Sequence, residues 1–162
     1  MAAESRELRM ITFRVGRETF VLDIMAVRQI IPYTGSTTVP TAPAFIEGII
    51  VLRNEVIPIV DLRDRLFTNG SERADQPLVL VTYSSLGLIG LKVDEVRRIV
   101  TLNTEAFLPP PALVRGIRGE LLISVIKMEN EVLLLIDVEN ILSSDEQQEL
   151  RAAKLEESLA PR

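Results

Sequence analysis

The sequence of 162 residues contains no cysteine and no histidine. Their absence excludes disulfide bonds, thiolate or imidazole metal ligands, and the Ser-His and Cys-His pairs that activate many protein nucleophiles. It also excludes a histidine that carries a phosphoryl group. The side chains left for catalysis are carboxylates, lysine, serine, threonine and tyrosine, so a catalytic site would have to appear as a cluster of these.

Long hydrophobic runs are also missing. No stretch approaches the roughly 18 apolar residues of a membrane span. The first ten residues carry four charges and no apolar segment of the kind found in a secretory signal. We therefore expect a cytoplasmic protein that does not insert into a membrane.

Positive charge is the third shortage. Eighteen Lys and Arg residues face 23 Asp and Glu residues, for a net charge of -5, so the molecule as a whole repels a phosphate backbone. Aromatic residues are few, and basic and aromatic residues do not alternate along strands as a nucleic-acid-binding barrel requires. We keep that barrel as a rival interpretation and expect no nucleic-acid partner.

Branched aliphatic residues are abundant instead, with 22 Leu, 16 Ile and 16 Val. This content supplies a real hydrophobic core and excludes a chain that is disordered throughout. The length fits one domain, or two very small units that share a core.

The chain contains an internal duplication. Three segments carry it: residues 20–31 match 89–100, residues 46–49 match 114–117, and residues 54–62 match 130–138. The offset rises from 69 to 76 along the chain, which places an insertion between Gly116 and Asn130. We assign residues 11–67 to the first barrel copy, 78–142 to the second, and 143–162 to a C-terminal helix and tail, with a polar linker at 68–77.

Each copy has the periodicity of strands. Apolar residues alternate with polar ones at 11–16, and apolar runs at 46–52 and 56–62 flank a short polar turn, as do runs at 117–128 and 132–138. These pairs predict β-hairpins. Continuous apolar runs such as 132–136 indicate strands buried on both faces, so we predict an all-β protein of two short barrels.

Several segments are predicted to lie outside the strands. Proline-rich stretches at 32–43 and 103–112 are expected to be extended loops, since proline removes a backbone donor. Short helical turns are expected at 24–30 and after Asp61 and Asp137. A capping box of Ser143 and Glu146 predicts a weakly packed helix to about residue 159.

Three aspartates, Asp61, Asp64 and Asp137, could be imagined as an acid-base set for hydrolysis. However, Asp61 and Asp137 occupy equivalent places where a strand gives way to a helical turn, which is the preferred place for a capping aspartate. We favour capping, and we predict a protein that is not an enzyme and holds no metal or other cofactor.

Four apolar residues occupy equivalent places in the two copies: Val27, Ile30, Val96 and Ile99. They fill the core, or they line an apolar groove between the barrels. Arg53, at a hairpin tip, is a solvated surface residue or a planar donor aimed at a carboxylate or a partner backbone. The residues alone leave both alternatives open.

The order of several motifs resembles the CheW family of chemotaxis adaptors. The motifs are Val27-Arg28-Gln29-Ile30, the proline loop from Val39 to Gly48 with Phe45-Ile46-Glu47-Gly48, Leu52-Arg53, and the run from Val56 to Arg63. In the second half, Val93-Asp94-Glu95-Val96 and the segment from Leu135 to Leu142 are also similar to the family. The resemblance extends from about Thr12 to Leu142.

The resemblance implies two interlocked five-stranded SH3-like barrels and a non-enzymatic scaffold. The family couples the cytoplasmic tip of methyl-accepting chemoreceptors to the regulatory domain of the histidine kinase CheA, so this chain is expected at membrane-associated receptor arrays. The resemblance places a receptor groove at Val27, Gln29, Ile30, Arg53, Val96 and Ile99. It places the kinase contact at Thr41, Pro43, Phe45, Asn54 and Glu55.

Two positions depart from the family pattern. The family usually shows Val-x-Glu-Ile and Leu-Arg-Gly, whereas this chain has Gln29 and Asn54. Because Gln29 replaces the glutamate of Val-x-Glu-Ile, an ion pair between this position and Arg53 cannot form. Gln29 could still accept a hydrogen bond from Arg53. Asn54 tolerates a positive φ, so we expect the turn to persist. The departures leave open an adaptor of a non-flagellar chemosensory system, such as twitching or gliding.

Overall fold

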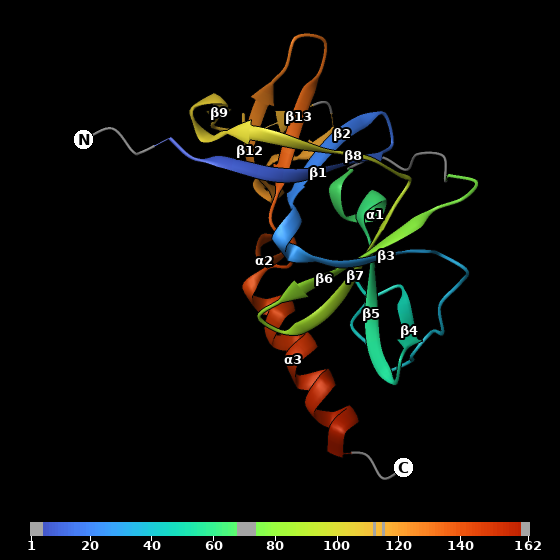
Figure 1. Ribbon diagram of the computed structural model, residues 1–162. Helices are drawn as coiled ribbons and strands as arrows, with labels where there is room; N and C mark the ends of the chain where they lie inside the picture. The colour runs from blue at the N-terminus through green and yellow to red at the C-terminus, as the bar shows by residue number, and fades with distance from the viewer. Residues whose placement is uncertain (1–4, 68–73, 112, 115, 160–162) are drawn as a thin grey trace.

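The computed structural model describes residues 5–67, 74–111, 113–114 and 116–159. Short strands form two curled sheets, one above the other in Figure 1, and a long helix extends downward near the C-terminus. The predicted all-β class and the pair of small barrels are confirmed.

The upper sheet in Figure 1 has the strand order β8-β1-β2-β13-β12-β9. Its strands are β1 (Glu7–Val15), β2 (Glu18–Asp23), β8 (Glu95–Asn103), β9 (Phe107–Leu108), β12 (Leu122–Lys127) and β13 (Val132–Ile136). The lower sheet has the order β3-β6-β7-β5-β4. Its strands are β3 (Val27–Pro32), β4 (Gly48–Leu52), β5 (Glu55–Asp61), β6 (Leu78–Ser84) and β7 (Gly87–Val93). A separate two-stranded pairing joins β10 (Leu113–Val114) to β11 (Ile117–Arg118).

Each sheet combines strands from both copies of the repeat. Strands β1 and β2 join β8, β12 and β13, whereas β6 and β7 join β3, β4 and β5. The junctions are two equivalent parallel pairs, β2 with β13 and β7 with β5. The predicted copies at 11–67 and 78–142 are therefore segments of the sequence, and neither forms a sheet by itself, because each sheet takes strands from both.

The register of the parallel pairs reproduces the offsets found in the sequence. Val21 pairs with Leu135 in the upper sheet, and Gly90 pairs with Ile59 in the lower sheet. Gly90 follows Val21 by 69 residues, and Leu135 follows Ile59 by 76. The internal duplication is thus confirmed in three dimensions.

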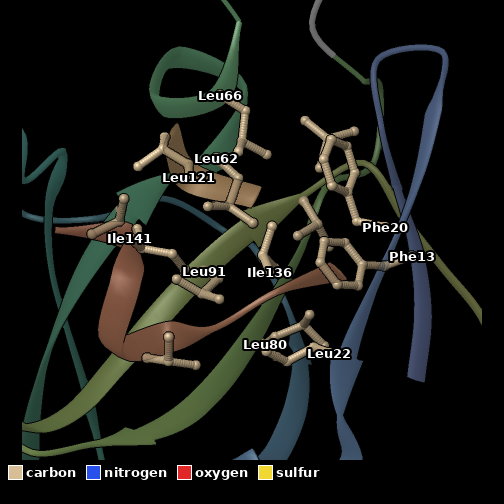
Figure 2. Close-up of a cluster of buried hydrophobic side chains, with 14 of the residues drawn as sticks. Phe13, Phe20, Leu22, Leu62, Leu66, Leu80, Leu91, Leu121, Ile136 and Ile141 are labelled. Carbon is tan, nitrogen blue, oxygen red and sulfur yellow. The ribbon is translucent and has the colours of Figure 1, made fainter. Parts of the chain in front are cut away.

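The hydrophobic core has a central part between the sheets and one part within each sheet. The central core takes residues from both sheets, and Figure 2 shows Phe13, Phe20, Leu22, Leu62, Leu66, Leu80, Leu91, Leu121, Ile136 and Ile141 within it. In β13, Leu134 belongs to this central core, whereas Leu133 and Leu135 belong to the interior cluster of the upper sheet. The predicted burial of this strand on both faces is confirmed. Each fully buried aliphatic side chain contributes about 1.5–3 kcal/mol, so the central core binds the two sheets together.

Both predicted hairpins form. Strands β4 and β5 pair antiparallel, as do β12 and β13. The apolar run at 117–128 is not one strand, however, because a 3-10 turn, η3 (Gly119–Leu121), separates β11 from β12. The insertion in the second copy is accommodated here by the β10–β11 pairing and this turn.

The helical turns after Asp61 and Asp137 are confirmed as α1 (Leu62–Leu66) and α2 (Val138–Ile141). The turn predicted at 24–30 is wrong beyond its first residues: η1 (Ile24–Ala26) is helical, but β3 begins at Val27 because its backbone pairs with β6. The segment 103–112 is also less irregular than predicted. It contains η2 (Thr104–Ala106) and β9, whose backbone pairs with β12.

The C-terminal helix α3 (Ser144–Leu159) begins with the predicted capping box. The Glu146 carboxylate accepts from the Ser143 N–H at 2.8 Å, and the Ser143 hydroxyl accepts from the Glu146 N–H at 3.2 Å. Leu150 packs into the central core. In the described part of the chain, no helix is both long enough and apolar enough to cross a membrane. Most of the predicted linker at 68–77 lies outside the described residues.

Candidate partner-binding surfaces

The residues predicted for a receptor groove lie mainly on β3 and β8. Each of these strands is at one edge of its sheet. Each strand carries a β-bulge at an equivalent place, after Val27 in β3 and after Val96 in β8. Ile30 and Ile99 follow these bulges and are 41% and 48% exposed. Two large aliphatic side chains are thus open to solvent at matching positions of the repeat.

The two valines of the same set are only half-buried and pack against the central core. Val27 and Val96 therefore serve the core in part. Their exposed portions adjoin Ile30 and Ile99 along the two strands. A partner on this surface would meet the isoleucines most directly.

Met25 is another exposed apolar residue close to β3 in the chain, and the sequence analysis did not identify it. It lies in η1, which packs against β1 and β6, the neighbours of β8 and β3. Its side chain is 82% exposed. Methionine is flexible and polarizable, so it adapts to apolar partners of different shape. Met25 lies in a turn and so does not follow the alternation of a strand, which is why the sequence pattern did not indicate that it is exposed.

Gln29 and Arg53 do not form the hydrogen bond that their side chains would allow. Both residues are described by the structure, which gives no hydrogen bond between them. The same strand and the same hairpin are connected instead by Arg28 and Glu55, with the guanidinium 3.0 Å and 3.1 Å from the two carboxylate oxygens. An ion pair therefore links β3 to the hairpin tip, with the cation on the strand and the anion on the hairpin.

The hairpin tip itself is a two-residue turn between β4 and β5. Leu52 pairs with Glu55, and the two residues between them have positive φ values, 50° for Arg53 and 68° for Asn54. Positive φ at both central positions defines a type I′ turn, in which asparagine is well tolerated. The expectation that the turn persists with Asn54 is confirmed. Arg53, Asn54 and Glu55 are all exposed.

The remaining residues predicted for kinase contact lie on the loop between β3 and β4 and differ in exposure. Thr41 is exposed, Pro43 is buried, and Phe45 is half-buried against the central core. The Pro43 carbonyl accepts from the Ile46 N–H at 3.0 Å. Pro43 and Phe45 thus shape the loop, while Thr41 lies on its surface.

A polar cluster fixes the base of this loop. The Glu47 carboxylate accepts from the Tyr33 hydroxyl at 2.5 Å and from the Lys92 ammonium at 3.0 Å. The same ammonium lies 4.1 Å from the centre of the Tyr33 ring, a cation–π contact. Burial raises the pKa of Tyr33, and its hydrogen bond to Glu47 adds to the rise. The loop is therefore held to β7 by buried charge.

Gly48 has no room for a side chain, because the loop crosses directly over it. A Cβ atom here would lie 2.4 Å from the Ser36 hydroxyl and 2.8 Å from the Thr37 carbonyl oxygen. Thr37 forms an isolated β-bridge with Ile49 at this crossing. The glycine of the Phe-Ile-x-Gly motif thus permits close packing of two backbone segments.

Arg65 joins the loop to the C-terminal helix. Its guanidinium pairs with Glu146, donates from Nε to the Ile141 carbonyl at 2.9 Å, and lies 5.9 Å from the centre of the Phe45 ring. Burial disfavours the ionised form of Glu146. The Ser143 N–H and the Arg65 guanidinium outweigh that effect and hold the pKa of Glu146 below its ordinary value.

Two of the three aspartates considered for hydrolysis, Asp61 and Asp137, serve as helix caps, whereas Asp64 lies within α1. Asp61 accepts from the Arg63 N–H at 2.9 Å, and Asp137 accepts from the Glu139 N–H at 3.0 Å. Burial raises the pKa of Asp61, with the nearby Asp64 charge adding to the rise. Within the described residues, no group of three or more acidic side chains could hold a metal ion.

Comparison with known proteins agrees with this fold. The family model of the CheW-like domain matches residues 9–146. The chain is 32% identical over 157 residues to a chemotaxis protein CheW of Treponema pallidum, covering 93% of this chain and 91% of that protein. It is 34% identical over 143 residues to the CheW of Rhizobium meliloti, covering 88% and 91%. The crystal structure of the scaffolding protein TtCheW from Thermoanaerobacter tengcongensis superposes with a TM-score of 0.76 at 23% identity, over 87% of this chain and 96% of that one.

Proposed function

This chain belongs to the CheW-like domain family, and from that membership we propose that it is a chemotaxis scaffold. In this role it binds the cytoplasmic tip of a chemoreceptor on one surface and the regulatory domain of the histidine kinase CheA on another. No bond is made or broken by the scaffold. Its output is assembly, because holding the kinase beside the receptor raises their effective concentration.

The observation that carries the receptor half of the proposal is the matched exposure of Ile30 and Ile99. Each isoleucine is already about half buried, so covering the rest of it against a partner releases about 1 kcal/mol, before the cost of association is subtracted. An amphipathic helix presents apolar side chains at suitable spacing for such a surface. Val27, Val96 and Gln29 border the two isoleucines, and Arg53 contributes donors from the hairpin tip.

The kinase half of the proposal depends on polar residues at the hairpin tip and on the loop, not on exposed apolar side chains. The rigid turn at Asn54, the carboxylate of Glu55 and the exposed Thr41 form a polar surface whose shape is fixed by Pro43 and Phe45. A preorganised surface loses little conformational entropy on binding. Resemblance to the family implies that the regulatory domain of the kinase has this same fold, so it would meet this surface with a barrel end of its own.

The proposal places the protein in the cytoplasm, recruited to membrane-associated receptor arrays by its partners. Ile30→Asp and Ile99→Asp test the receptor surface, because both side chains are exposed and a charge there spares the core. Ile123→Asp is a matched control, since Ile123 is 42% exposed but lies on β12. We expect the first two variants to lose most co-sedimentation with receptor-containing membranes and the control to retain it. Equal binding by all three would overturn the receptor assignment.

A pull-down tests the kinase surface separately. The bait is the CheA regulatory domain, and the variants are Asn54→Asp and Thr41→Arg, which change charge or size at exposed positions. We expect both to weaken capture by the kinase domain while receptor co-sedimentation is unchanged. Capture at the level of the unmodified protein would contradict the assignment. Failure of the unmodified protein to bind the kinase domain at all would overturn the kinase half of the proposal.

A further inference from the structure

The chain passes between the two sheets at two places that the repeat relates. The first crossing is η1, which joins β2 of the upper sheet to β3 of the lower sheet. The second is Asp94 alone, which joins β7 of the lower sheet to β8 of the upper sheet. The repeat offset of 69 places Met25 and Asp94 at equivalent positions. Each crossing leads directly into a strand that carries an exposed isoleucine, Ile30 in β3 or Ile99 in β8.

Asp94 is anchored to both sheets. Its carboxylate accepts from the Gly16 N–H at 2.7 Å, in the turn between β1 and β2, and pairs with the guanidinium of Arg63 on α1. Its own N–H donates to the Arg14 carbonyl at 2.9 Å. Because α1 follows β5 of the lower sheet, these contacts, which we call the Asp94 clamp, tie the second crossing to both sheets. The ion-paired side chains are only 10% and 18% exposed, so solvent ions screen the pair weakly.

The equivalent residues at the first crossing cannot form this clamp, because Met25 carries no charge. The offset of 69 relates Gly16 to Ser85, in the turn between β6 and β7, and the offset of 76 relates Arg63 to Glu139 on α2. The Glu139 carboxylate accepts from the Ser85 N–H at 2.6 Å and from its hydroxyl at 2.7 Å. The helix therefore holds the turn directly, and the contact bypasses Met25, whose side chain is 82% exposed.

The hydrogen bonds that hold η1 are local. The Met25 N–H donates to the Asp23 carboxylate at 2.9 Å, and the Val27 N–H donates to the Ile24 carbonyl. No residue of η1 is fully buried, although Ile24 and Ala26 pack partly against the central core. A segment with local hydrogen bonds and half-buried side chains opens at a lower free-energy cost than one fixed by long-range polar contacts.

We propose that η1 is a hinge, at which the start of β3 moves relative to the upper sheet, whereas the Asp94 clamp keeps the start of β8 fixed. A hinge of this kind needs only a few residues at the end of an element to absorb the change in backbone angles. The hinge follows from the contacts alone, but its use rests on the proposed receptor role. In that role the β8 side of the surface is fixed and the β3 side adjusts to the partner.

Hydrogen exchange of the full chain, followed by mass spectrometry, tests the hinge without any variant. The segments compared are 24–28 and 93–97, each corrected for the intrinsic exchange rate of its sequence. We expect exchange at 24–28 to be about tenfold faster, because local opening exposes its amides. Exchange at 24–28 that is equal to or slower than exchange at 93–97 would overturn the inference.

The repeat also supplies a variant that should close the hinge. Met25→Asp combined with Glu139→Arg gives the first crossing the residues of the Asp94 clamp. We expect exchange at 24–28 to slow by about threefold to tenfold in this double variant. Met25→Leu is the control, since it keeps an apolar side chain, and it should leave exchange unchanged. Circular dichroism establishes that each variant is folded.

The reverse exchange of residues should open the second crossing. Asp94→Met combined with Arg63→Glu gives that crossing the residues of the first, and exchange at 93–97 should rise by about threefold to tenfold. If both double variants are folded and exchange as the unmodified protein does, the clamp is not the cause of the difference and the inference fails.

The use of the hinge is tested by adding a soluble helical-hairpin fragment of a chemoreceptor cytoplasmic tip. Binding of the fragment should slow exchange at 24–28 more than at 93–97. A fragment that binds without this difference would overturn the use of the hinge in receptor binding. Absence of binding would overturn the proposed receptor role, and the comparison in the free protein would still decide whether the hinge exists.

Discussion

Val21 and Gly90 occupy equivalent positions in the two central parallel pairs, yet only the first position has room for a side chain. Val21 is fully buried in the interior cluster of the upper sheet. At Gly90 a Cβ atom would lie 2.6 Å from Cδ1 of Ile59 and 2.9 Å from Cγ1 of Val79. The lower barrel is therefore packed more tightly at this point, and the two halves of the duplication have diverged in their interiors.

We predict that Gly90→Ala lowers the free energy of unfolding by about 1–3 kcal/mol, because overpacking forces buried neighbours to move. Urea denaturation followed by circular dichroism measures the change. Adding Ile59→Val removes the nearest methyl group and should recover part of the loss, although this change alone costs about 0.5–1.5 kcal/mol. If the double variant is less stable than the sum of the single changes, the contact with Ile59 is not the cause.

The local features of this fold could be predicted from the sequence. The hairpins, the type I′ turn at Asn54, and the caps at Asp61 and Asp137 all depend on residues that are near one another in the chain. The repeat could be recognised because each matched segment keeps one constant offset along its length. The exchange of strands between copies could not be read from the residues, because the pairing of β2 with β13 joins segments more than 100 residues apart and leaves no local periodicity.

The error at 24–30 has a specific physical origin. Val27 and Ile30 are three residues apart, a spacing typical of a helix. The β-bulge in β3 inserts one residue and produces the same spacing in a strand. Arg28 is the inserted residue. The Val-Arg dipeptide occurs at 27–28 and again at 96–97, and this repetition was the signal that could have revealed the bulge. No comparable signal marked Met25.

Gly48→Ala should destabilise the fold by about 1–3 kcal/mol, because one of the contacts that a Cβ would make is with the backbone of Thr37, which cannot rotate away. Urea denaturation again gives the magnitude. Ser36→Ala in the same background removes the hydroxyl contact but leaves the carbonyl contact, so we expect only partial recovery. A midpoint equal to that of the unmodified protein would show that the loop does not cross Gly48 closely in solution.

The stability of the C-terminal helix should depend on pH through Glu146. Its pKa is held below the ordinary value in the folded protein, so its contribution to stability is present above about pH 4.3, the usual value for an unfolded chain, and is lost as the pH falls through the folded-state pKa. Glu146→Gln should therefore cost about 0.5–2 kcal/mol at pH 7 and progressively less below pH 4. Denaturation of both proteins across this range tests the prediction.

Glu149→Gln is the matched control for that experiment, because Glu149 lies one turn away on the same helix and is exposed. It should leave the pH profile unchanged. A constant difference between Glu146→Gln and the unmodified protein from pH 3 to pH 7 would show that the carboxylate does not stabilise the helix through its charge.

The turn at the hairpin tip offers a change that should increase stability. Arg53 has a φ of 50°, a left-handed conformation that costs most residues about 1 kcal/mol or more, and Asn-Gly is the sequence that type I′ turns prefer. Arg53→Asn combined with Asn54→Gly should therefore raise the free energy of unfolding by about 1 kcal/mol, whereas Asn54→Val should lower it by a similar amount because a β-branched residue resists positive φ. The opposite signs separate backbone strain from side-chain contacts, since both Arg53 and Asn54 are exposed. Stability that falls in both variants would mean that the two-residue turn does not form in solution, and the rigid polar surface proposed for the kinase would lose its basis.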